Sequence, residues 1–137
     1  MTRTIGSLFS GGGGWEDGAI EAGVRPLFGV EMDATVAGHY ATVFGPHVFV
    51  GSVLDAPYRD MPRVDILVSS PPCQPTSKSG AQARARQRAR GFLVDDEAEG
   101  SFCDPRVGLA TLDAVVALHP RAVIVENSEA YIKSKVF

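Results

Sequence analysis

Short apolar segments alternate with helix-like stretches along most of the 137-residue chain. This alternation restricts the possible folds more than any other feature. The mostly apolar segments that predict strands cover residues 5–9, 27–30, 48–50, 64–68 and 122–125. The stretches that predict helices cover residues 15–22, 34–44 and 107–118. Because strands that alternate with helices join parallel neighbours, the sequence predicts an α/β fold with five mainly parallel strands and helices on both faces.

The composition is that of one soluble globular domain over residues 1–137. Hydrophobic residues make up 45% and charged residues 21% of the chain, which are ordinary values. No signal peptide is evident, and no apolar run is long enough to cross a membrane. Cys73 and Cys103 are too few for a disulfide framework or a cysteine-rich zinc site, so we expect a reducing, cytoplasmic setting and no metal.

Two predicted helices carry side-chain patterns that bear on packing. Glu16 and Asp17 stand in the first turn of the helix at residues 15–22, where the helix macrodipole favours acidic side chains. In the helix at residues 107–118, four large apolar side chains share one face. They are Leu109, Leu112, Val115 and Val116.

A glycine-rich turn at residues 10–14 joins the first strand to the first helix. Such a turn lets a ligand approach the backbone closely, and Glu31, at the end of the second strand, can accept hydrogen bonds from ribose hydroxyls. Together they predict a nucleoside-containing cofactor. The dinucleotide pattern G-x-G-x-x-G is a poor match, because Glu16 or Asp17 occupies its third glycine position, which argues against NAD.

Pro71 and Pro72 end the strand at residues 64–68, because proline has no N–H group to donate to a sheet. Cys73 therefore lies on a loop at the carboxyl edge of the sheet, where ligands bind in open α/β folds. Glu126 and Asn127 follow the last strand and emerge at the same edge. A strand-end acid alone is usually a solvated side chain, but its pairing with Cys73 favours a functional site.

The chain resembles the cytosine-C5 DNA methyltransferases from about Ile5 to Ile132. The motifs that carry the resemblance are Ser7-Leu8-Phe9-Ser10-Gly11-Gly12-Gly13-Gly14, Glu31, Pro72-Cys73-Gln74, Asp104-Pro105-Arg106 and Glu126-Asn127. The resemblance implies a Rossmann-like methyltransferase sheet with strand order 3-2-1-4-5 and S-adenosylmethionine as the cofactor. It also implies DNA as the partner.

By this resemblance, Phe9 and Met32 lie against the adenine of the cofactor and Glu31 holds its ribose hydroxyls. The glycine loop faces its amino-acid end. The full set of implied cofactor-binding residues is Phe9, Ser10, Gly11, Gly13, Glu31, Met32, Ser52, Val53 and Pro72.

The resemblance also assigns the chemistry. The Cys73 thiolate adds to C6 of cytosine, which makes C5 nucleophilic enough to take a methyl group. Glu126 binds the N3 edge of the base and stabilises or delivers a proton there. The base must leave the duplex to reach this pocket.

A second set of residues is expected to contact nucleic acid. Gln74, Ser77 and Ser79 lie on the catalytic loop, which also carries a run of arginines suited to phosphate contact. A solvated loop, whose charges are partly cancelled by the acids that follow, is the alternative. The basic residues of this set are Arg84, Arg86, Arg88, Arg90 and Arg106.

Three positions depart from the family pattern, since Ser52, Thr76 and Ser128 replace an acidic, an aromatic and a valine residue respectively. The family's downstream Gln-Arg-Arg segment and target-recognition region have no counterpart before Phe137. We therefore expect a partial catalytic domain, either a fragment or one half of a split enzyme completed by a second polypeptide. An RNA cytosine-C5 methyltransferase and an inactive remnant that binds cofactor or a partner remain as alternatives.

Overall fold

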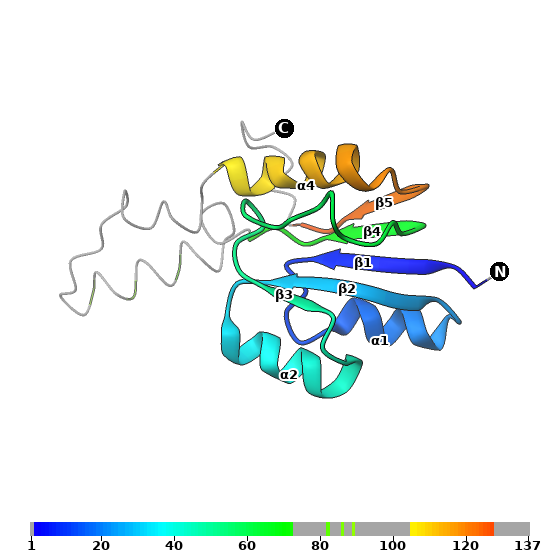
Figure 1. Ribbon diagram of the computed structural model, residues 1–137. Helices are drawn as coiled ribbons and strands as arrows, with labels where there is room; N and C mark the ends of the chain where they lie inside the picture. The colour runs from blue at the N-terminus through cyan, green and yellow to red at the C-terminus, as the bar shows by residue number, and fades with distance from the viewer. Residues whose placement is uncertain (1, 73–81, 83–85, 87–88, 90–104, 128–137) are drawn as a thin grey trace.

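The computed structural model describes residues 2–72, 82, 86, 89 and 105–127. Its centre is a parallel sheet of five strands in the order β3-β2-β1-β4-β5 (Figure 1). The strands are β1 Thr4–Leu8, β2 Arg25–Glu31, β3 Val48–Val50, β4 Ile66–Ser69 and β5 Ala122–Val125. The helices are α1 Gly14–Glu21, α2 Ala34–Phe44 and α4 Pro105–Leu118. The predicted fold class and strand order are confirmed, and every predicted end lies within two residues of the observed one.

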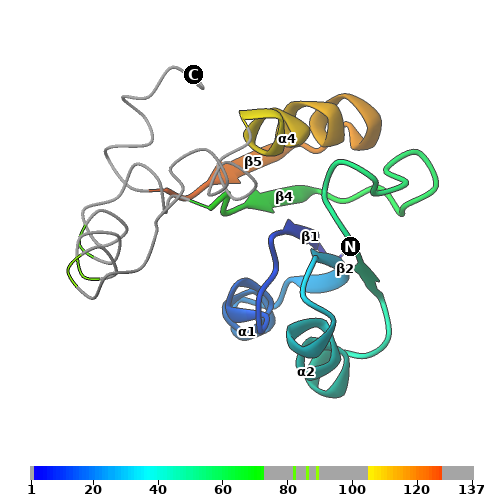
Figure 2. The same cartoon turned by 90° about the vertical axis from the view of Figure 1, so that its left-hand side faces the viewer.

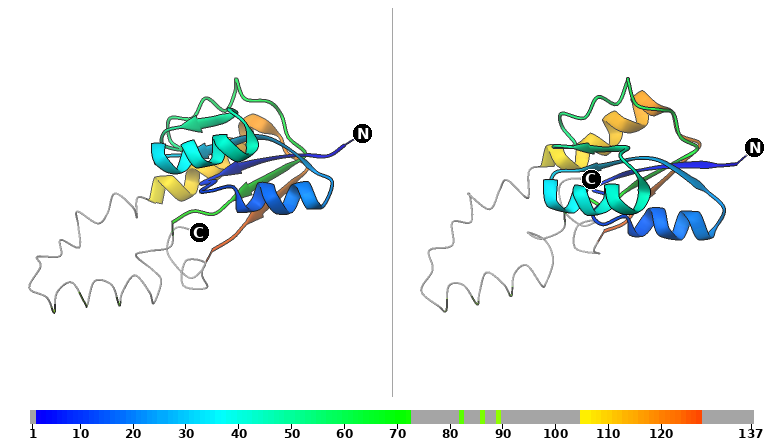
Figure 3. Two further views of the ribbon diagram at one scale, coloured as in Figure 1. Left: turned by 90° about the horizontal axis from the view of Figure 1, so that it is seen from below. Right: turned by 60° about the horizontal axis from the view of Figure 1, so that its bottom comes forward.

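The helices cover both faces of the sheet, with α1 and α2 on one side and α4 on the other (Figures 2 and 3). Successive strand side chains point to opposite faces, so each face has its own apolar cluster. The smaller cluster, beneath α1, contains Ile5, Ala19 and Val68. The larger cluster, beneath α4, contains Leu8, Phe28, Val30, Val53, Tyr58, Val64, Leu67, Ala110, Ala114 and Leu118.

Helix α4 meets the sheet through small side chains together with Leu118 at its C-terminal end. Ala110 and Ala114 are buried against the sheet, and the buried Thr111 hydroxyl lies 2.7 Å from that of Ser69 on β4. The face predicted from the sequence is mostly solvent-exposed: the exposed fractions are 46% for Leu109, 60% for Leu112 and 71% for Val116. The small residues therefore occupy much of the inner face of α4, while Leu109, Leu112 and Val116 lie on its outer face.

Strand β5 is the edge of the sheet, and its apolar side chains are exposed. Val123, Ile124 and Val125 have exposed fractions of 41%, 42% and 43%. Within the described residues β5 pairs with β4 alone, which leaves its outer backbone groups open. An open apolar edge readily pairs with another strand. None of the helices in the described part of the chain has the length and apolar content needed to span a membrane.

Replacing Leu67 with alanine should lower the free energy of unfolding by about 2–5 kcal/mol, since the side chain is fully buried between the sheet and α4. Leu112→Ala removes the same atoms from an exposed site on α4 and should change the free energy of unfolding by no more than about 0.5 kcal/mol. Urea denaturation followed by circular dichroism measures both values. Equal losses would contradict this packing.

Candidate functional site

The loop between β1 and α1 is fixed to the end of β2 by hydrogen bonds. The Ser10 N–H donates to the Val30 carbonyl over 3.0 Å. The Glu31 carboxylate accepts from two backbone N–H groups, that of Gly11 at Oε2 and that of Asp33 at Oε1, each over 2.9 Å. Glu31 thus connects the glycine loop to the start of α2.

The glycine loop is open on one side and tightly packed on the other. A Cβ atom added at Gly11, Gly12 or Gly14 would meet no atom within 4 Å. At Gly13 it would lie 2.0 Å from the Phe44 ring, and the φ angle of 91° there also favours glycine. A ligand can therefore approach the backbone from the open side, while the packed side holds the loop against α2.

The other predicted cofactor residues lie around the same strand ends. Phe9 has a φ angle of 57°, a conformation that costs a bulky residue roughly 1–3 kcal/mol. Met32 is 61% exposed. The Gly51 N–H donates to the Glu31 carbonyl over 2.9 Å, which brings the segment that leads to Ser52 beside β2.

Ser52 and Val53 differ in their surroundings. The Ser52 hydroxyl, half-buried, accepts a hydrogen bond from the Leu54 N–H over 3.2 Å. Val53 is buried in the apolar cluster beneath α4, and its carbonyl accepts a hydrogen bond from the Tyr58 hydroxyl over 2.6 Å. Of the two side chains, that of Ser52 is the more accessible to a ligand.

The ends of β4 and β5 meet at the same edge as the glycine loop. The Glu126 N–H donates to the Ser69 carbonyl over 3.0 Å, and the Asn127 side-chain amide donates to the Pro71 carbonyl over 2.7 Å. The Ser70 hydroxyl accepts a hydrogen bond from the Trp15 indole over 3.0 Å. The predicted closeness of the two strand ends is confirmed.

Several predicted site residues lie outside the described part of the chain. Pro72, described and half-buried, is the last residue before them. Arg86 and Arg106 are described, and both are exposed. The residues outside are Cys73, Gln74, Ser77, Ser79, Arg84, Arg88 and Arg90.

Two residues of this region were missed by the sequence analysis. Glu16 is fully buried in α1, although its position suggested a solvated acid at a helix start. Its place three residues before the buried Ala19 was the available signal, because residues three apart share a helix face. Trp15 links the start of α1 to β4 through Ser70, and no sequence pattern indicated that contact.

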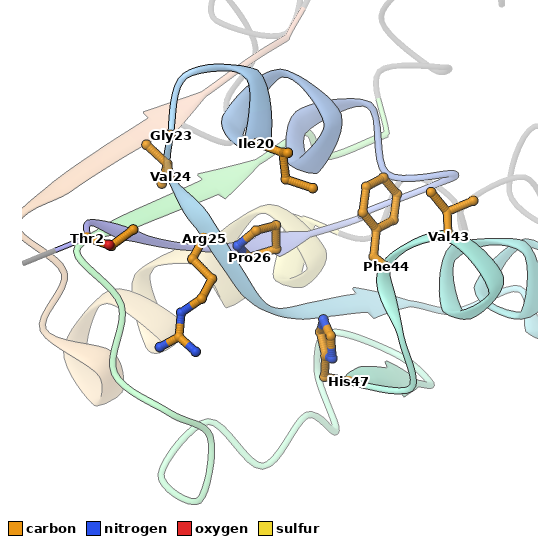
Figure 4. Close-up of a pocket in the computed structure, with 9 residues that line it drawn as sticks. All are labelled: Thr2, Ile20, Gly23, Val24, Arg25, Pro26, Val43, Phe44 and His47. Carbon is orange, nitrogen blue, oxygen red and sulfur yellow. The ribbon is translucent and has the colours of Figure 1, made fainter.

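A hollow of about 530 Å³ lies between α1 and α2, near the start of β2. Figure 4 shows its lining residues, which come from the start of β2 and the C-terminal ends of α1 and α2. Among them are Ile20, Arg25, Pro26, Val43, Phe44 and His47. Ligands of open parallel sheets bind at the carboxyl ends of the strands, so this hollow is not the candidate site.

The sheet order, the glycine loop after β1 and the acid after β2 define a Rossmann-like methyltransferase fold. Solved structures share it. The Dnmt2 methyltransferase of S. pombe aligns with a TM-score of 0.63 and 14% identity over 97% of this chain and 36% of that chain. An E. coli protein described as a DNA modification methyltransferase encoded within a prophage aligns with a TM-score of 0.64 and 20% identity, over 98% of this chain and 34% of that chain.

The chain belongs to the C-5 cytosine-specific DNA methylase family, whose model matches residues 3–136. Membership of this family implies that the cofactor is S-adenosylmethionine. The Type II methyltransferase M.Bsp6I of Bacillus sp. (strain RFL6) is 28% identical over 124 residues, which are 90% of this chain and 35% of that protein. The chain thus spans about a third of the length of this curated relative.

Replacing Glu31 with glutamine should loosen the glycine loop. A glutamine side chain has one acceptor oxygen for two backbone donors, so either the Gly11 or the Asp33 N–H loses its partner. Amide hydrogen exchange measured by NMR should quicken about tenfold at one of these residues. Glu21→Gln, at an exposed position of α1, is the control. Unchanged exchange at both amides would refute this role of Glu31.

Proposed function

We propose that this chain carries the catalytic region of a DNA cytosine-C5 methyltransferase. In this proposal a methyl group passes from S-adenosylmethionine to C5 of cytosine through a covalent adduct with Cys73. The observation that carries the proposal is the meeting of two strand ends, where Asn127 binds Pro71 beside the glycine loop. The Pro71-Pro72 pair leads directly to Cys73 in the sequence, and the Glu126 N–H donates to the Ser69 carbonyl at the end of β4.

The residues at the ends of β1 and β2 fit the cofactor. The open side of the loop at Gly11, Gly12 and Gly14 leaves room for its amino-acid end, and backbone N–H groups at a helix start suit a carboxylate. Glu31 uses one lone pair of each oxygen on the backbone, so others remain for ribose hydroxyls. The exposed Met32 side chain offers an apolar surface for adenine. The cofactor supplies an electrophilic methyl group bonded to a sulfonium sulfur.

The chain's own residues prepare the cytosine for methylation. The Cys73 thiolate forms an S–C6 bond, and the displaced electron pair makes C5 nucleophilic. Glu126 holds the N3 edge of the base and stabilises the charge that develops there. Once C5 carries the methyl group, C5 loses its own proton to a base. The S–C6 bond then breaks, and the Cys73 thiolate and Glu126 return to their starting states.

The arginine run and Arg106 supply positive charge for phosphate contact. Because phosphate contacts carry no base identity, they suit DNA and RNA alike. Transfer of radiolabelled methyl groups to duplex DNA and to transfer RNA tests the substrate. Labelling of DNA supports the proposal, and labelling of transfer RNA alone would replace DNA by RNA. If the chain labels neither duplex DNA nor transfer RNA even when a second polypeptide completes it, the chain is a remnant that binds cofactor or a partner.

Replacing Cys73 with alanine should abolish methyl transfer, because the base then has no nucleophile at C6. Cofactor affinity should stay within about twofold of the wild-type value, since the thiol does not hold the cofactor. Cys103→Ala is the matched control and should retain activity. DNA that contains 5-fluorocytosine should give a covalent adduct, located by mass spectrometry of the peptides. An adduct at Cys103 would overturn the assignment.

We also propose that a second polypeptide pairs with the outer edge of β5 and covers the exposed apolar face of α4. The support is the run of half-exposed apolar side chains on β5, together with Leu109, Leu112 and Val116 on α4. A strand added there would satisfy the open backbone groups and bury both surfaces. The curated relative has about two thirds of its length beyond the part that this chain matches, which is room for such a segment.

Mixing the chain with a polypeptide that carries the remaining strands, the Gln-Arg-Arg segment and the recognition region should raise its thermal midpoint and restore methyl transfer. Ile124→Lys should prevent this, because a charge on β5 opposes strand addition. Val43→Lys, at an exposed site on α2, should not. Full turnover by the unmixed chain, or normal complementation of Ile124→Lys, would refute the proposal.

A further inference from the structure

A buried carboxyl group lies behind the glycine loop. The side chain of Glu16 is 0% exposed, and its Oε1 accepts hydrogen bonds from two hydroxyl groups, that of Ser7 on β1 and that of Tyr40 on α2 over 3.2 Å. We call these residues the Ser7–Glu16–Tyr40 cluster. It joins three elements at one point, while the predicted cofactor residues Phe9, Ser10, Gly11 and Gly13 lie in the loop beside it.

The cluster closes the base of the loop. Ser7 stands on β1 before the loop and Glu16 on α1 after it, so their hydrogen bond fixes the separation of the two ends of the loop. The connecting residues 8–15 then have little freedom. Preorganising a loop in its binding conformation improves affinity, because less conformational entropy is lost when the ligand binds.

Helix α2 holds the same loop from the outside. The Tyr40 ring packs against the Phe44 ring, with centroids 5.0 Å apart. Phe44 in turn fills the space beside Gly13. Tyr40 and Phe44 therefore restrain the loop at two points, one through the Glu16 carboxyl and one through van der Waals contact.

Burial disfavours the ionised form of the Glu16 carboxyl. Among the described residues its Oε2 is buried and has no hydrogen-bond partner, and an ionised oxygen in that position is costly. Burial raises the pKa of Glu16 above its ordinary value, whereas the Ser7 and Tyr40 hydroxyls and the charge of His47 act in the opposite direction. The pKa of Tyr40 is also raised, chiefly by burial, so its hydroxyl remains a donor.

We propose that Glu16 is a positioning residue for S-adenosylmethionine: its buried carboxyl group accepts hydrogen bonds from Ser7 and Tyr40 and so holds the glycine loop in its binding conformation. The inference rests on the proposed cofactor site. It assigns Glu16 no contact with the cofactor, because Glu16 is fully buried behind the loop.

The proposal gives the loop a pH dependence with a definite sign. Unfolded glutamate titrates near its ordinary pKa of about 4.3, and the folded group titrates higher. Between these values the native state binds more protons than the unfolded state, so stability falls as pH rises. His47 and Tyr40 are the titratable groups that act on Glu16 from the surrounding elements, and the burial penalty exceeds their effect. Cofactor affinity should fall over the same range, because ionisation makes the buried conformation of Glu16, which holds the loop, less stable.

Three variants of the full chain test this role. Glu16→Gln keeps the acceptor oxygen without a titrating group, and Glu16→Ala removes both hydrogen bonds. Asp17→Asn alters an exposed acid in the same helical turn and is the matched control. Cofactor binding is followed by the fluorescence of Trp15, the single tryptophan, over a pH series that starts near the ordinary glutamate pKa of about 4.3 and continues upward. The thermal midpoint without cofactor is recorded in parallel.

At neutral pH we expect Glu16→Gln to bind S-adenosylmethionine at least as tightly as the wild type, and Glu16→Ala roughly tenfold more weakly. Affinity and midpoint should fall with pH in the wild type and in Asp17→Asn, but not in Glu16→Gln. Where Glu16→Ala does not fold, the pH profile of Glu16→Gln decides. Unchanged binding by Glu16→Ala, or a wild-type pH slope in Glu16→Gln, overturns this inference alone. Absence of binding by the wild type overturns the proposed cofactor site as well.

Discussion

Parallel pairing of β1 with a strand on each side is the interaction on which the rest of the structure depends. Thr4–Leu8 pairs with β2 along one edge and with β4 along the other. Because all these strands run in the same direction, their carboxyl ends meet at one edge of the sheet. Glu31 at the end of β2 and Pro71 after β4 thereby lie on either side of the glycine loop, although 40 residues separate them in the sequence. The site is a consequence of this register.

The two halves of the site are held in different ways. On the β2 side, the hydrogen bond that Glu31 accepts from the Gly11 N–H and those within the Ser7–Glu16–Tyr40 cluster restrain the loop from several directions. On the β5 side, the Asn127 amide and the Glu126 N–H join two strand ends at the rim of an open, apolar edge. The first half carries most of the residues proposed for the cofactor, whereas the second carries Pro72 and the residues proposed to act on a cytosine.

Much of the site was predictable because its residues stand at strand ends. A glycine run, a strand-end acid and a Pro-Pro-Cys sequence each have a local physical reason, namely backbone freedom, an accessible acceptor and a forced end of pairing. Resemblance then assigned them to cofactor and base. The outer face of α4 was not predictable in this way. Periodicity located its large apolar side chains, but the packed structure shows Ala110 and Ala114 facing inward instead.

The sequence by itself determined the order of strands and helices, the loop that separates β1 from α1, and the residues that follow each strand. These follow from local preferences and from alternation, which act over a few neighbouring residues. Tertiary structure alone decided the burial of Glu16, the exposed stripe of Leu109, Leu112 and Val116, and the contact of Trp15 with Ser70. The reason is physical: burial and hydrogen bonding depend on which surfaces meet, and residues distant in the sequence supply those surfaces.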